Sequence, residues 1–125
     1  METASDETLH SQVGREHREL LDQVLDKWSL LVLDKLCESP RRFNELRRAI
    51  PAVSQKSLTT SLRRLERNGM IERVLVTTRP IAVEYRISTL GRTLQNLIDA
   101  LLGWTTDHMA AVEEARETFD AENDA

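Results

Sequence analysis

The sequence predicts a mainly α-helical fold with one small β-hairpin, and three observations lead to this prediction. Apolar side chains recur every three or four residues through most of the chain, as they do on one face of an α-helix. Between residues 70 and 87 Val, Ile and Tyr alternate with charged residues, which is typical of strands. A chain of 125 residues suits one domain with a sizeable core.

The chain starts with a polar segment that lacks periodicity, so we expect a flexible tail over residues 1–14 and one folded domain over residues 15–125. Residues 15–26 predict a first helix. The side chains that we expect it to bury are Leu20, Leu21, Val24 and Leu25. The next segment, KWSLLVLDKLC, is apolar on nearly every side and predicts a central helix packed by several neighbours. This helix should end near Pro40, because proline disfavours a helical residue before it.

Two helices joined by a tight connection follow. The segment NELRRAI predicts a short helix with Asn44 as its N-cap. Ser54 can cap a second helix of about fifteen residues, SQKSLTTSLRRLERNG, and Gly69 supplies the left-handed residue that often terminates a helix. Leucines spaced four and three residues apart mark its buried face: Leu58, Leu62 and Leu65. The pair has the outline of a helix-turn-helix.

A β-hairpin comes next, with strands expected at residues 70–76 and 82–87. Residues 77–81 form the expected loop, in which Pro80 lies outside the strand pairing and Arg79 makes the tip basic.

From Thr89 onward the pattern is helical again, with Gly103 as a candidate break. An apolar stripe about thirty residues long runs along this segment. It consists of Leu90, Leu94, Leu97, Ile98, Leu101, Trp104, Val112 and Phe119.

Charge is sorted along the chain. Residues 41–86 contain eleven Lys or Arg and four Asp or Glu, a net charge of +7, whereas the rest contains six and seventeen, a net charge of −11. A basic middle attracts phosphate and acidic ends repel it. The expected partner is therefore nucleic acid.

The second helix of the pair has a polar face without an acidic residue before Glu66. With the hairpin behind it, the order of elements is that of a winged helix-turn-helix, whose second helix enters a DNA major groove about 12 Å wide. We assign to base edges Gln55, Lys56, Thr59 and Thr60. We assign to phosphates Ser54, Ser57, Arg63 and Arg64. Arg79 is expected at the adjacent minor groove or its phosphates.

Other arginines have two interpretations. Phosphate contact and plain solvation are equally open for Arg41, Arg42, Arg47 and Arg48. Solvation, or pairing with Glu66, Glu72 or Glu84, is favoured over DNA contact for Arg67, Arg73 and Arg86.

Several function classes are not expected. The longest apolar run, residues 30–33, is far below the ~20 residues needed to cross a bilayer, so we expect a soluble, cytoplasmic protein. One cysteine and three scattered histidines do not suit a metal site. No nucleophile motif or phosphate-binding glycine loop is present, so we expect neither an enzyme nor a cofactor.

Three segments, KWSLLVLDKL, PRRFNELRRAIPAVSQKSLTTSLRRLERNGMIER and VEYRISTLGRTL, resemble the HxlR-type family of transcription regulators, a MarR-like branch of winged-helix proteins. The resemblance covers residues 25–94. It implies a homodimer that binds a near-palindromic operator in double-stranded DNA and adjusts transcription. It also implies that the first and last helices form the dimer interface.

Three points stay open at this stage. The family includes redox sensors, but their cysteine lies ahead of the first or second helix, so Cys37 is interpreted as packing in preference to thiol sensing. Trp28 and Trp104 could hold a small apolar effector, although aromatic core is the commoner meaning. The alternative function is a winged-helix module that binds proteins without binding DNA.

Overall fold

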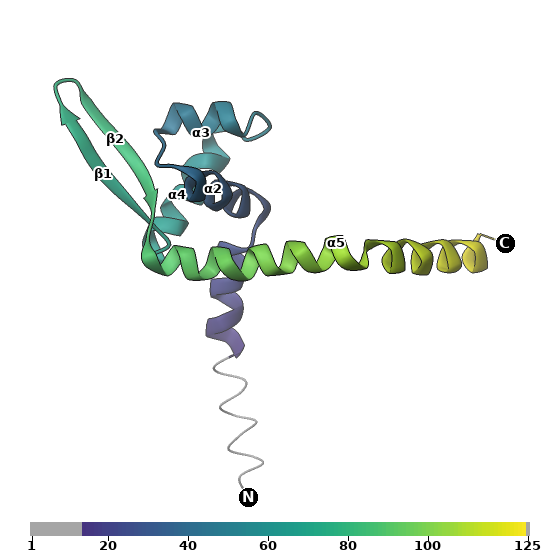
Figure 1. Ribbon diagram of the computed structural model, residues 1–125. Helices are drawn as coiled ribbons and strands as arrows, with labels where there is room; N and C mark the ends of the chain where they lie inside the picture. Colours follow the sequence, from purple (N-terminus) through teal and green to yellow (C-terminus); the bar gives the residue numbers. More distant parts are fainter. Residues whose placement is uncertain (1–13, 125) are drawn as a thin grey trace, which may run out of the picture.

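The computed structural model describes residues 14–124, and the expected tail lies outside these residues except for Gly14, which is already helical. A mainly helical body carries a two-stranded hairpin on one side, which confirms the predicted winged helix-turn-helix architecture (Figure 1). Helical residues 14–24 come first. Then follow α2 (Lys27–Glu38), α3 (Phe43–Ala49), α4 (Gln55–Arg67), β1 (Ile71–Thr78), β2 (Ile81–Ile87) and α5 (Thr89–Asn123).

The core forms around α2, which contacts α3, α4, α5 and β2. The prediction of a central helix is therefore confirmed. Its start is capped by Asp26, whose carboxylate accepts hydrogen bonds from the backbone N–H of Trp28 at 2.9 Å and from the buried Ser29 hydroxyl at 2.6 Å. Its buried apolar side chains are Val32, Leu33 and Leu36. The helix ends at Glu38, two residues before Pro40, as expected.

The start of α3 differs from the prediction. Asn44 is not the N-cap, because the helix already begins at Phe43 and the cap residue is Arg42. The side chain of Glu45 reaches back and accepts a hydrogen bond from the Arg42 backbone N–H at 2.8 Å. A carboxylate at the third helical position thus satisfies the backbone N–H of the actual cap residue, two positions ahead of the predicted cap Asn44.

The helical residues 14–24 bury less than expected. Val24 is buried, but Leu20, Leu21 and Leu25 are 40%, 48% and 39% exposed, so the prediction that all four are buried is wrong for a single chain. Gln23 joins this segment to the end of α4, because its Oε1 accepts a hydrogen bond from Asn68 Nδ2 at 2.9 Å.

The hairpin is longer and its turn shorter than predicted. Thr77 pairs with Ala82 and Thr78 with Ile81, so both threonines belong to β1 and the turn consists of residues 79–80. A register shift between Leu75 and Thr77 places one extra residue in β1, which lets the ladder continue toward the tip. The base of β2 also pairs with the chain ahead of α3, through two backbone hydrogen bonds between Tyr85 and Arg41 at 2.8 and 3.0 Å.

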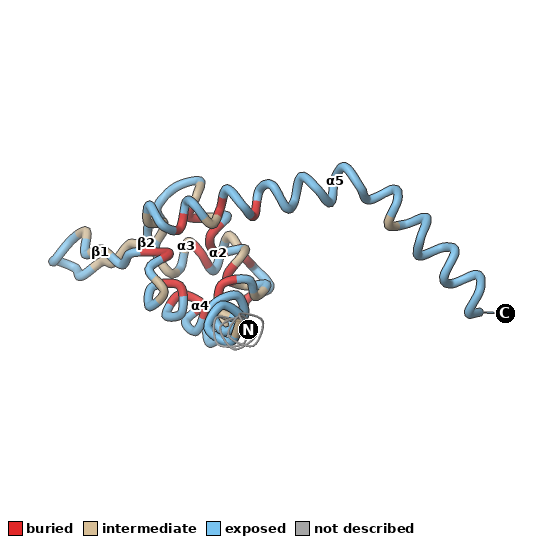
Figure 2. The backbone as a smooth tube through the Cα atoms, turned by 90° about the horizontal axis from the view of Figure 1, so that it is seen from below, coloured by how far each residue is buried: buried red, intermediate tan, exposed pale blue. Residues whose placement is uncertain are grey.

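The last helix, α5, runs unbroken through Gly103, so the candidate break there is wrong. Its first turns pack on the body, where Gly91 lies so close to the Met70 carbonyl that a Cβ would approach it within 2.1 Å. Beyond Ile98 the helix projects away from the body, and its residues are exposed apart from the half-buried Val112 (Figure 2).

Candidate nucleic-acid interface

The polar face of α4 is open to solvent along its whole length. Its exposed residues are Gln55, Lys56, Thr59, Thr60, Arg63 and Arg64, preceded by the exposed Ser54; Ser57 is half-buried. The sequence therefore placed all eight of these predicted residues on one accessible stretch of helix. Four of them were assigned to base edges and four to phosphates, and these roles remain predictions.

The opposite side of α4 anchors it to the body. Leu58, Leu62 and Leu65 are at most 2% exposed, and the helix contacts α2 and β1. Ser61, which the sequence interpretation did not single out, is buried on the same side at 4% exposure. This anchoring fixes the direction of the polar face, which is what a helix needs to enter a groove in one orientation.

The N-terminus of α4 is built as the sequence predicts. The hydroxyl of Ser54 accepts a hydrogen bond from the Ser57 backbone N–H at 3.0 Å, which confirms the capping role. At the other end Gly69 has a φ of 78°, which confirms the left-handed terminator. Since helix N-termini attract anions, the cap lies where a phosphate is favoured.

Arg79 lies at the tip of the hairpin and is exposed. The hairpin extends away from the helices in both views, so Arg79 and the α4 residues form two separate cationic positions on one chain (Figures 1 and 2). The peptide bond between Arg79 and Pro80 is cis, and the hydroxyl of Thr77 donates to the Pro80 carbonyl across the turn.

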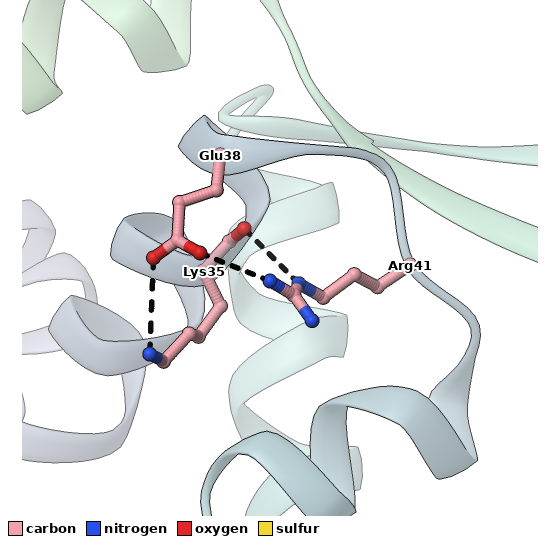
Figure 3. A network of polar contacts seen from close by, with 3 residues as sticks. All are labelled: Lys35, Glu38 and Arg41. Atoms are coloured by element: carbon pink, nitrogen blue, oxygen red, sulfur yellow. Dashed lines mark hydrogen bonds and ion pairs between the residues drawn. The ribbon is translucent and has the colours of Figure 1, made fainter.

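Arg41 belongs to an internal network (Figure 3). Its Nη2 lies 3.1 Å from Glu38 Oε1, and its Nε donates to the Lys35 carbonyl at 3.2 Å. Lys35 Nζ lies 3.7 Å from the other oxygen of Glu38. Arg41 is therefore paired within the protein, which is neither the phosphate contact nor the plain solvation that the sequence left open.

The arginines of the strands are paired with carboxylates. Arg73 Nε lies 3.9 Å from Glu66, and Arg86 Nη2 lies 3.1 Å from Glu84, as the sequence interpretation favoured. Tyr85 lies beside Arg73 in the ladder. Burial raises the pKa of its phenol above the ordinary value of 10.0, although the Arg73 charge acts to lower this pKa.

The sequence interpretation missed a groove of about 830 Å³ between α3 and β2. Arg42 and Arg48 line it, and within residues 14–124 neither arginine has an ion pair. The strand on its other side is about forty positions away in sequence. Local periodicity does not indicate which segments so far apart meet, so the groove had no signal in the pattern.

Other predicted positions are separate from this surface. Cys37 is half-buried in the last turn of α2. Trp28 packs against the core, whereas Trp104 stacks on His108, with ring centroids 4.7 Å apart, in the exposed part of α5. In the described part of the chain no group of three or more His, Cys, Asp or Glu is placed to hold a metal ion. None of the helices in residues 14–124 combines the length and the apolar character needed to span a membrane.

Comparison with known proteins gives consistent matches. A family model described as HxlR-like helix-turn-helix matches residues 23–113. The HTH-type transcriptional regulator YtcD of Bacillus subtilis (strain 168) is 37% identical over 92 residues, which cover 74% of this chain and 73% of YtcD.

Two solved structures have the same fold. The transcriptional regulator ytfH from Salmonella typhimurium has a TM-score of 0.69 and 36% identity, with 81% of this chain and 90% of that chain covered. The redox regulator HypR in its reduced form has a TM-score of 0.69 and 30% identity, with 79% and 98% covered. At 36% and 30% identity, these two proteins are similar to this chain in sequence as well as in fold.

Proposed function

The chain belongs to the HxlR-like helix-turn-helix family, and it is a transcriptional regulator with a DNA-binding fold. We propose that it acts in the cytoplasm as a homodimer on a near-palindromic operator. The observation that carries the proposal is the exposed, acid-poor face of α4 held rigidly by its buried leucines.

The first support for a homodimer is the apolar surface of α5. Leu97, Leu101 and Trp104 are 68%, 60% and 52% exposed, and Phe119 near the end of the helix is 64% exposed. Several large apolar side chains exposed along one helix of a small protein indicate an interaction site. A second copy is the proposed partner.

The first helical segment supplies the second support. Its exposed leucines, Leu20, Leu21 and Leu25, lack a cover within the described chain, although the sequence pattern is that of a buried face. α5 has 35 residues and is therefore about 50 Å long, enough to reach beyond its own domain to a partner. Burial of both apolar surfaces between two copies accounts for the patterns that a single chain leaves exposed.

A twofold dimer suits a two-part operator. In helix-turn-helix dimers the two recognition helices bind half-sites about 34–36 Å apart, one turn of DNA, and the symmetry of the protein is matched by a palindrome. In the proposed complex α4 of each copy enters a major groove. Gln55, Lys56, Thr59 and Thr60 bind base edges there, because their groups donate or accept hydrogen bonds without adding negative charge.

The remaining predicted residues hold the helix in register. Ser54 and Ser57 at the start of α4, together with Arg63 and Arg64, bind phosphates. Arg79 at the hairpin tip binds the adjacent minor groove or its phosphates. These contacts set position and affinity, whereas the base contacts set the sequence that is chosen.

Retention of genomic DNA fragments tests the proposal. The purified full chain is mixed with sheared genomic DNA at low salt, and the retained fragments are sequenced with and without an oxidant. We expect enrichment of a near-palindromic motif, with an affinity whose logarithm falls with log salt by about 0.9 per neutralised phosphate. Retention of no fragment at low salt contradicts the proposal and favours the protein-binding alternative.

The oxidant arm addresses Cys37. Because this residue is half-buried and lies within a helix of the core, we expect the same fragments in both arms. If oxidation abolishes DNA retention by the wild type while Cys37→Ser still retains DNA after oxidation, the thiol has a sensing role.

A further inference from the structure

The wall of the groove on the hairpin side is a strand edge. Tyr85 uses both its backbone N–H and its C=O to bond Arg41, on the side away from β1. Backbone groups alternate in direction along a strand, so the N–H and C=O of Val83 point to the same side. The chain turns into α3 at Phe43, so this pairing stops after Arg41. Beyond Tyr85, no backbone hydrogen bond from residues 14–124 reaches this edge of β2 where it enters the groove.

This edge carries few of the features by which proteins block strand addition. Lysine, proline and a register shift are common protections of an edge strand. β2 reads IAVEYRI, without lysine or proline; its two charged residues, Glu84 and Arg86, pair with each other, and the register shift of the hairpin lies on β1. α3 contacts β2, and a groove of about 830 Å³ is lined by both elements.

Apolar side chains and arginines line the groove together. Phe43 from α3 and Val83 and Ile81 from β2 contribute apolar surface, and Ile81 is 77% exposed. Arg42, the residue that caps α3, and Arg48 within α3 contribute positive charge. This lining therefore suits an occupant that carries both acidic and apolar groups.

The two acidic residues of the groove are already engaged. Glu45 accepts the hydrogen bond from the Arg42 backbone, and Glu84 pairs with Arg86 at 3.1 Å. Arg86 compensates the charge of Glu84, whereas Glu45 keeps its negative charge because a backbone N–H carries no net charge. Arg42 and Arg48 against Glu45 leave the lining with a net charge of 2 − 1 = +1. The groove therefore keeps an attraction for negative charge.

We propose that the groove binds an extended acidic segment of a partner protein, which adds to β2 as a further strand beyond Tyr85. Backbone hydrogen bonds to Val83 supply one part of the affinity, and alternate side chains that reach Phe43 and Arg48 supply the specificity. A DNA strand fits these observations less well. Its phosphates can accept from arginines and N–H groups, but they cannot donate to the Val83 carbonyl or cover Ile81.

The test uses the full chain labelled with ¹⁵N and a capped octapeptide of alternating Glu and Val. We expect saturable shifts of the backbone amides in residues 42–48 and 81–85, with the amides of α4 unchanged. Peptides with N-methyl groups at alternate positions, or with Lys in place of Glu, are expected to bind at least about fivefold more weakly, since each loses one class of contact.

A matched pair of variants localises the site. Arg48→Gln is expected to weaken the peptide about fivefold, whereas Arg47→Gln, on the same helix but outside this groove, is expected to leave it unchanged. The expected fivefold effect corresponds to the loss of one exposed ion pair between the arginine and the peptide.

Three results overturn the inference: no saturable shift at millimolar peptide, equal binding of the N-methylated peptide, or shifts confined to α4. If duplex DNA shifts residues 81–85 and Arg48→Gln weakens the duplex but not the peptide, the occupant is nucleic acid. None of these results removes binding of operator DNA by α4, so failure here is distinct from failure of the proposed function.

Discussion

At the scale of single residues, the α4 face depends on side chains with two roles. Ser54 closes the helix start through its bond to Ser57, and the same hydroxyl lies where a phosphate is expected. Sequence spacing was sufficient to predict this cap, because a serine directly ahead of a helical apolar pattern caps the helix through neighbouring residues alone. It was not sufficient for α3, where the side chain of Glu45 decided between neighbouring start positions.

Substitution of Ser54 separates its two roles. Ser54→Ala is expected to lower the free energy of unfolding by about 1 kcal/mol, because the cap is lost, whereas Ser54→Asn and Ser54→Asp keep it. Ser54→Asp adds a negative charge near the expected phosphate and should weaken operator binding about fivefold relative to Ser54→Asn. Chemical denaturation and fluorescence anisotropy measure the two effects. Equal DNA binding by the Asn and Asp variants shows that no phosphate lies there.

Base and phosphate contacts are separable by their dependence on DNA sequence. Thr59→Ala or Thr60→Ala should cost about 1–3 kcal/mol on the operator and little on random DNA, so that sequence choice relaxes. Arg64→Ala should weaken both duplexes by a similar factor and reduce the salt slope by about 1. Anisotropy titrations with the two duplexes measure this. An equal loss on both duplexes for the threonine variants refutes the base-edge assignment.

At the scale of elements, the pattern predicted which segments are helices or strands and missed features set by contact between segments. Thr77 and Thr78 were predicted to belong to the loop between the two strands. In the structure β1 contains one extra residue, and beyond it both threonines pair with β2. Gly103 read as a break, yet a glycine within a long helix costs only about 1 kcal/mol and does not end it. The groove beside β2 forms because α3 and β2, far apart in sequence, come close in the fold, and no local sequence pattern predicts that contact.

The junction between the hairpin and α5 depends on Gly91. A Cβ at this position meets the Met70 carbonyl oxygen at 2.1 Å and Ile87 Cγ1 at 2.8 Å, so Gly91→Ala forces the first turn of α5 away from the body. We expect Gly91→Ala to lower the free energy of unfolding by about 1–3 kcal/mol.

Gly103→Ala is the matched control for the junction. Nothing lies within 4 Å of a Cβ at position 103, and alanine favours the helix, so this variant should be slightly stabilising. Thermal unfolding of both variants measures the difference. A Gly91→Ala variant as stable as the wild type contradicts the close approach.

At the scale of the whole molecule, the exposed apolar surface and the sorted charge both suit the proposed homodimer on DNA. The leucines of the first helix read as buried from the sequence and are exposed in the single chain, as is the outer stripe of α5. An apolar pattern in the sequence indicates that a face is buried. It does not indicate whether that face packs on the chain's own core or on a partner, so the sequence alone could not decide between the two for these leucines. In the proposed homodimer both surfaces are covered and two α4 faces turn toward one duplex.

The dimer is tested by adding charge to α5. Leu101→Glu places a carboxylate in the apolar stripe, and we expect it to shift the molecule from dimer to monomer at micromolar concentration, because an unpaired charge cannot be buried without a large cost. Thr106→Glu adds the same charge at another exposed position of α5, away from the stripe, and should remain dimeric. Sedimentation equilibrium measures the masses. A wild-type chain that is monomeric throughout contradicts the proposed dimer.

The most direct measurement of the central claim compares two reversals of charge on operator DNA. Arg63→Glu alters the exposed face of α4, and Arg116→Glu makes the same change of net charge on the distant outer part of α5. In anisotropy titrations with a retained fragment, Arg63→Glu is predicted to weaken binding about tenfold or more and Arg116→Glu to leave it near the wild-type value. Equal losses, or undiminished binding by Arg63→Glu, contradict the claim that α4 meets the duplex.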